Sequence, residues 1–88
     1  MLKFLVLKKV GRDTECAYST QELKLARAFY ARERQGLRLA GCKVSDNGSF
    51  SDKSVIPFEG NIYRGDIESL SYAGHNGSGL MALKVYNE

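Results

Sequence analysis

The sequence has no tryptophan, one proline, one histidine and only two cysteines. Two cysteines cannot build a disulfide scaffold, and one histidine without a Cys-x-x-Cys pair lacks the ligand spacing of a structural metal site. No stretch approaches the roughly 18 apolar residues of a membrane-spanning helix, and the apolar run at residues 4–7 is too short for a secretory signal. We therefore expect a cytoplasmic protein that has reduced thiols, binds no metal or cofactor and does not enter a membrane.

The composition is that of a small globular protein. The chain has 88 residues, 43% of them apolar and 26% charged, which excludes a disordered tail. No repeat or linker divides it, so we expect a single domain over residues 1–88. A domain of this size buries roughly 60–65% of its unfolded surface, which leaves a thin stability margin. A homodimer that supplements this margin stays open.

The charges are divided unevenly along the chain. Residues 1–43 carry ten basic and four acidic residues, whereas residues 44–88 carry three basic and six acidic ones. A chain divided in this way can present a basic surface and an acidic surface.

The N-terminal segment predicts a central strand over residues 2–10. Phe4 and Val6 alternate with Leu5 and Leu7, so both faces of this strand are apolar. A second cover is then needed, either a curled sheet or another subunit. Glycine at the first position of Gly11-Arg12 suits a two-residue hairpin loop. In that register the predicted cross-strand pairs are Lys8–Glu15, Leu7–Cys16 and Leu5–Tyr18.

A helix is predicted over residues 20–35. Ser19 and Glu22 have the spacing of a capping box, and Gly36 is a suitable left-handed stop. At 100° per residue an apolar arc forms that should pack on the sheet. This arc consists of Leu23, Leu25, Ala26, Phe29 and Tyr30.

Two further hairpins are predicted after the helix. Asn47-Gly48 and Asn76-Gly77 are strong signals for two-residue hairpin loops. The second loop pairs Leu70 with Leu83 and leaves the face that carries Ser69 and Lys84 in water. The predicted fold is therefore α+β, in a ββαββββ-like order: a mainly antiparallel sheet of five or six strands with one helix packed on one face.

A row of basic residues lies opposite the predicted apolar arc. Lys24, Arg27 and Arg34 align along this side, and no acidic residue at i±4 neutralises Lys24 or Arg27. Arg32 lies further round the helix, and Arg38 follows in the chain. These basic residues are the candidate partner-binding set: Lys24, Arg27, Arg32, Arg34 and Arg38.

No arrangement of residues indicates catalysis. His75, the only histidine, lies beside a predicted hairpin loop and has no nucleophile at a suggestive spacing. The glycine-rich residues 74–79 lack the spacing of a phosphate-binding loop. One enzymatic alternative is a small ribonuclease-like toxin that uses His75 with Arg64. We expect no enzyme activity.

The leading hypothesis is a small binding module, an adaptor or inhibitor that engages an acidic protein surface through the basic helix face. Small inhibitors of host machinery that phages encode have this profile. The alternative is a nucleic-acid-binding accessory protein that contacts phosphates and reads few bases. No aromatic platform supports that alternative, which depends on charge alone.

Overall fold

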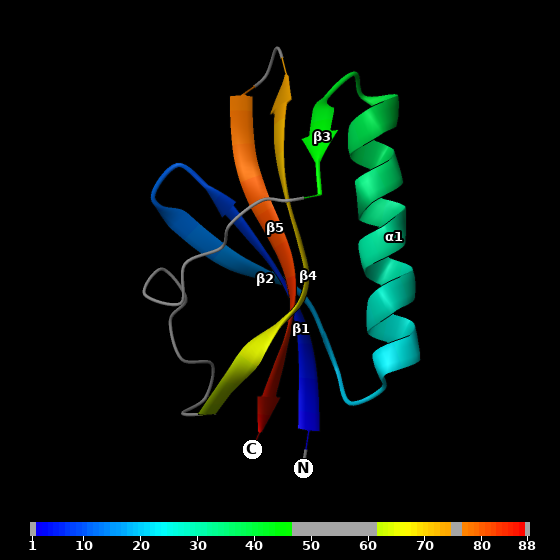
Figure 1. Cartoon of the computed structure of the whole chain (residues 1–88), viewed down its shortest axis with the longest axis vertical. Helices are drawn as coiled ribbons and strands as arrows, with labels where there is room; N and C mark the ends of the chain where they lie inside the picture. The colour runs from blue at the N-terminus through cyan, green and yellow to red at the C-terminus, as the bar shows by residue number, and fades with distance from the viewer. Residues whose placement is uncertain (1, 47–61, 75–76, 88) are drawn as a thin grey trace.

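Five strands and one helix make up the part of the chain that the computed structural model describes, residues 2–46, 62–74 and 77–87 (Figure 1). In chain order they are β1 (Leu2–Val10), β2 (Asp13–Thr20), α1 (Leu23–Leu39), β3 (Lys43–Ser45), β4 (Ile62–Gly74) and β5 (Gly77–Asn87). The strands form one antiparallel sheet in the order β2-β1-β5-β4-β3. The α+β class, with one helix packed on the sheet, is confirmed. The predicted hairpin at Asn47-Gly48 and any sixth strand after it lie outside the described residues.

The first and last strands occupy the centre of the sheet. β1 has the predicted bounds, and it pairs with β2 on one side and with β5 on the other. Its four apolar residues are all buried: Phe4, Leu5, Val6 and Leu7. Both faces of the central sheet are therefore covered within a single chain, so this burial does not require a second subunit.

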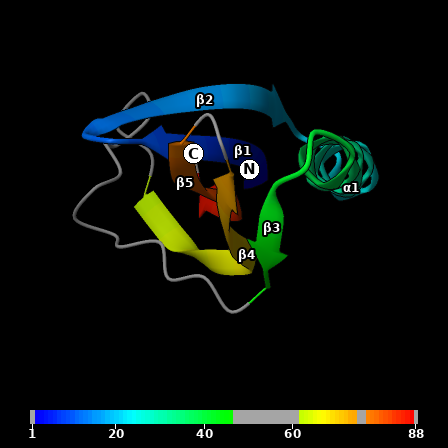
Figure 2. The ribbon, with the colours of Figure 1, turned by 90° about the horizontal axis from the view of Figure 1, so that it is seen from above.

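The core lies between one face of the sheet and α1. Val6 opposes Leu83, and Leu70 opposes Met81, so these four side chains share a face. The buried cluster on that face consists of Phe4, Val6, Ala26, Tyr30, Leu70, Met81 and Leu83. The sheet is curved, and α1 lies beside β3 and the end of β2 (Figure 2). No helix among the described residues is both long and apolar enough to cross a bilayer.

The opposite face of β5 is also buried, and this corrects the prediction that it faces water. Lys84 opposes Leu5, and Ala82 opposes Leu7. Lys84 and Ala82 are both fully buried. The physical reason is the position of β5 in the middle of the sheet, where β1 places two buried leucines beside it.

The hairpin between β1 and β2 largely follows its sequence signal. Gly11 has a φ of 63°, as the first loop position requires, and Val10 pairs with Asp13. The predicted Lys8–Glu15 and Leu7–Cys16 pairs are confirmed. The predicted Leu5–Tyr18 pair is wrong, since a bulge between Val6 and Leu7 places Ser19 opposite Leu5 and turns Tyr18 toward the core.

The β4–β5 hairpin is shifted by two residues from the predicted register. Gly74 pairs with Gly77, Leu70 with Met81 and Glu68 with Leu83. The predicted pairing of Leu70 with Leu83 is therefore wrong. A shift of two residues leaves every side chain on its original face, so the predicted core face of this hairpin is still correct.

The helix begins later than predicted because β2 continues through the proposed cap. Ser19 and Thr20 pair with β1, so Ser19 does not cap a helix. Glu22 is the N-cap residue, and its own backbone N–H donates to the Thr20 Oγ1 at 3.1 Å. Competition from strand pairing thus overrides the capping-box pattern.

The helix also ends later than predicted. Gly36 lies inside α1, which continues to Leu39. Gly41 is the left-handed residue instead, with a φ of 87°. The Gly41 N–H donates to the Arg38 carbonyl and the Cys42 N–H to the Leu37 carbonyl, both at 3.0 Å. These two bonds form a Schellman motif, and they place Arg38 on the helix.

Candidate functional site

A basic surface runs along one side of α1. At 100° per residue, Lys24, Arg27, Arg34 and Arg38 lie within an arc of about 80° that borders the buried side of the helix. We call these four residues the basic row. Lys24, Arg27 and Arg38 are exposed, and Arg34 is partly buried. The row extends over about 21 Å, since each helical residue rises about 1.5 Å.

One member of the basic row is paired within the molecule. The Arg34 Nη2 donates to the Asp46 Oδ2, and Asp46 directly follows β3. The two side chains keep 35% and 52% of their surfaces accessible, respectively. Lys24, Arg27 and Arg38 form no ion pair within the described parts of the chain. Three of the four charges thus meet no acidic side chain there.

Arg32 lies apart from the basic row. It is exposed, and its position on the helix is about 80–160° away from the four residues of the row. The structure therefore brings together four of the five predicted partner-binding residues and separates the fifth from them.

The side of the helix that packs on the sheet is less apolar than predicted. Leu25 was expected to pack on the sheet, but 44% of its surface is exposed. Glu33 and Leu37, which were not part of the predicted apolar arc, are partly buried. The Glu33 Oε1 lies 3.3 Å from the Lys8 Nζ and so joins α1 to β1. Lys8 is therefore paired with Glu33 and does not extend the basic row.

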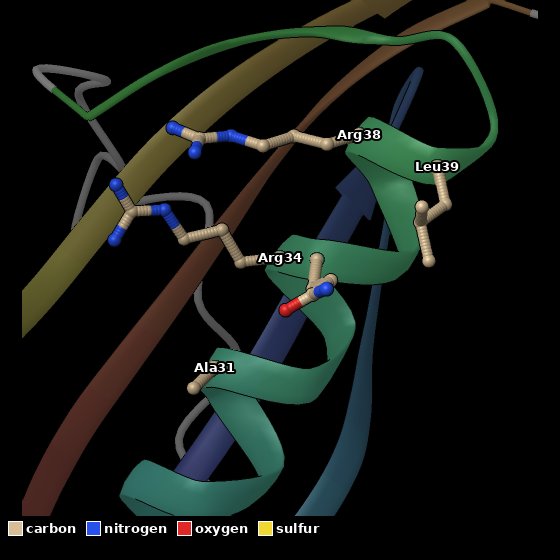
Figure 3. Close-up of a pocket in the computed structure, with 5 residues that line it drawn as sticks. Ala31, Arg34, Arg38 and Leu39 are labelled. Carbon is tan, nitrogen blue, oxygen red and sulfur yellow. The ribbon is translucent and has the colours of Figure 1, made fainter.

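A shallow groove lies at the C-terminal end of the basic row. It has a volume of about 500 Å³ and is lined by Ala31, Arg34, Gln35, Arg38 and Leu39. Arg34 and Arg38 extend from the same side of the helix, one turn apart (Figure 3). Leu39 keeps 80% of its surface exposed. The groove thus combines two guanidinium groups with an aliphatic wall.

Sequence reasoning missed Asp46, Leu39 and the two other residues of the groove. Asp46 is twelve residues from Arg34, and its place depends on the short strand β3. Leu39 lies beyond residue 35, where the predicted helix ends, so the predicted bounds leave it outside the helix. The Gly41 signal for a later stop was present in the sequence.

The two cysteines are free thiols and lie in different surroundings. Cys16 is exposed on β2, whereas Cys42 follows α1 and is partly buried. Desolvation raises the pKa of the Cys16 thiol above its ordinary value, and the charge of Lys3 opposes this by less. A raised pKa disfavours the thiolate, which is the nucleophilic form.

The remaining chemical candidates have no supporting geometry. His75 and the side chain of Arg64 lie outside what the structure describes, so the toxin alternative stays a hypothesis. Among the described residues, no three His, Cys, Asp or Glu side chains gather as a metal site would require.

Searches against protein-family models, curated proteins and solved structures found no match.

Proposed function

We propose that this protein is a non-enzymatic binding module whose basic row docks on an acidic surface of a partner protein. The observation that carries the proposal is the alignment of Lys24, Arg27 and Arg38 on one exposed side of α1 with no carboxylate beside them in the described structure. Like charges on one helix side repel one another, so an acidic partner relieves this repulsion on binding.

The surroundings of the basic row favour protein over nucleic acid. Leu39 and Ala31 add aliphatic surface to the groove that Arg34 and Arg38 also line. Protein interfaces commonly combine arginine with apolar side chains, and arginine is enriched among the residues that dominate binding energy. A phosphate backbone offers no comparable apolar contact.

The aromatic side chains give no support to base stacking. The Tyr18 and Phe29 rings stack on each other, with centroids 4.6 Å apart, and Tyr30 is buried. None of the described aromatic side chains is exposed. Single-stranded nucleic acids are usually held by exposed aromatic rings. Nucleic-acid binding thus remains the alternative that depends on the row of charges alone.

The test is a comparison of two charge reversals on opposite sides of the same helix. Arg27→Glu changes the basic row, whereas Arg32→Glu changes the net charge equally outside it. In a pull-down from a lysate of the native source, we expect Arg27→Glu to weaken capture of an acidic protein by about tenfold or more. Arg32→Glu should retain it, and raised salt should weaken wild-type capture.

The same two variants decide between the hypotheses. An equal loss with both variants would show that net charge, and not the basic row, drives the interaction. A mobility-shift measurement with duplex DNA and with RNA tests the alternative. Binding of a nucleic acid that Arg27→Glu abolishes, without capture of any acidic protein, would replace the proposal with the nucleic-acid hypothesis.

A further inference from the structure

The groove at the end of the basic row is lined by two of its arginines. Arg34 and Arg38 lie one helical turn apart and extend in the same direction (Figure 3). Two like charges at this spacing destabilise an isolated helix slightly. An anion that lies between them offsets that repulsion. An anionic group in the groove is therefore within reach of two guanidinium groups.

The molecule itself shows which anion Arg34 accepts. The carboxylate of Asp46 binds one terminal nitrogen of the Arg34 guanidinium. The Arg34 Nε is buried and has no hydrogen-bond partner in the described part of the chain. Carboxylates often bind arginine through two parallel hydrogen bonds. The Asp46 contact is thus a carboxylate interaction through one terminal nitrogen that leaves the Nε–H donor unused.

From this geometry we infer that the Arg34–Arg38 groove takes an acidic side chain of the partner protein, which displaces Asp46 from Arg34. This inference rests on the proposed function and names the anchor point of the basic row. Asp46 then acts as an internal competitor that lowers the affinity for acidic ligands. Its side chain is half exposed, so it can leave Arg34 without unfolding β3.

The residues that line the groove also predict which type of residue neighbours the acidic side chain in the partner protein. Ala31 and Leu39 contribute aliphatic surface, and Leu39 is the most exposed large apolar side chain described. Gln35 contributes an amide that can donate to a second carboxylate oxygen. The groove therefore fits an acidic residue with an aliphatic neighbour better than it fits a bare anion.

The experiment compares two single substitutions that change the net charge equally. Asp46→Asn removes the internal competitor, and Asp13→Asn is the matched control at the exposed β1–β2 hairpin, which lies away from α1 (Figure 1). Affinities are measured by fluorescence anisotropy with a labelled peptide in which leucines alternate with glutamates. A second peptide carries serines in place of the leucines.

We expect Asp46→Asn to bind the glutamate–leucine peptide about two- to fivefold more tightly than the wild type, since an exposed ion pair of this kind contributes modestly. Asp13→Asn should raise the affinity much less. The serine peptide should bind more weakly than the leucine peptide, and Leu39→Ala should remove that difference. Thermal unfolding of each variant establishes that the fold is retained.

Several results would overturn the inference. An equal gain with Asp46→Asn and Asp13→Asn would assign the effect to net charge. Equal binding of the two peptides would show that the aliphatic contact does not contribute to affinity. Displacement of the peptide by inorganic phosphate at similar concentration would indicate a general anion site. Self-association of Asp46→Asn without peptide would assign the groove to a second copy of the chain.

These failures differ from a failure of the proposed function. If Arg27→Glu weakens binding of the acidic peptide while Asp46→Asn leaves it unchanged, the basic row is the binding surface but Asp46 does not compete for it. If Arg27→Glu and Arg32→Glu bind the peptide equally, both the proposed function and the anchor fail.

Discussion

The central strand β5 and the outer side of α1 differ in how far they bury a leucine side chain. Leu83 on β5 is completely buried, whereas Leu39 at the end of α1 keeps 80% of its surface exposed. Leu83 belongs to the core cluster, and Leu39 lines the groove beside Arg34 and Arg38. The buried core and the proposed binding surface are thus separate regions, so substitutions should affect one without the other.

The largest expected effect compares these two leucines directly. Leu83→Ala should lower the free energy of unfolding by about 2–5 kcal/mol, because it removes a buried side chain from a packed cluster. Leu39→Ala should change it by less than about 0.5 kcal/mol. Urea unfolding followed by circular dichroism measures both. A similar loss for the two variants would mean that Leu39 is part of the folded core.

A second comparison uses two glycines, for which substitution by alanine should change the stability of the protein in opposite directions. A Cβ on Gly79 would lie 2.6 Å from the Tyr72 hydroxyl oxygen and 2.7 Å from the Lys9 carbonyl oxygen. Gly79→Ala should therefore destabilise the protein by about 1–3 kcal/mol.

Gly36 is the matched control on α1. It lies inside the helix, and a Cβ there would meet nothing within 4 Å. Gly36→Ala should therefore stabilise the protein by about 0.5–1 kcal/mol, because alanine favours a helix more than glycine does. Thermal unfolding measures both changes. A stabilising Gly79→Ala would contradict the close approach of β5 to Tyr72 and β1.

The smallest expected effect concerns Cys16. This residue is intermediate between the buried core and the exposed helix surface, because it is exposed yet its thiol is partly desolvated. Since burial raises the pKa of this thiol, the folded protein retains the proton at a pH where the unfolded chain loses it. This difference contributes to the free energy of unfolding. The contribution is fully present below the thiol pKa of the unfolded chain, and it is lost as the pH rises through the thiol pKa of the folded protein.

Iodoacetamide labelling followed by mass spectrometry provides the measurement. Mildly above neutral pH, Cys16 should react more slowly in the folded protein than in urea. Equal rates in the two states would show that Cys16 is as solvated as in the unfolded chain.

The two hairpins show how far the sequence predicts the sheet. At Gly11-Arg12 only one glycine offers a loop, and the Lys8–Glu15 and Leu7–Cys16 pairs follow from it. The segment from Gly74 to Gly79 offers several loop positions. Registers that differ by two residues bury the same faces, so the apolar pattern cannot choose between them. The observed register places Tyr72 opposite Gly79, where the absence of a side chain gives the ring room.

The candidate site was predictable in part. Lys24, Arg27 and Arg34 align through helical periodicity alone, so the sequence was sufficient to group them. Arg38 joined them only because α1 passes through Gly36 and ends at Gly41. The Asp46 contact required β3 to pair with β4 and could not be read from local patterns.

The sequence alone determined the secondary-structure types, the two-faced apolar strand β1 and the charge of the helix face, because each depends on residues near one another in the chain. Tertiary structure decided where β2 gives way to α1, the register of β5, the burial of Lys84 and the pairing of Arg34 with Asp46. These features depend on which distant segments meet, since strand pairing and burial compete with local preferences and can outweigh them.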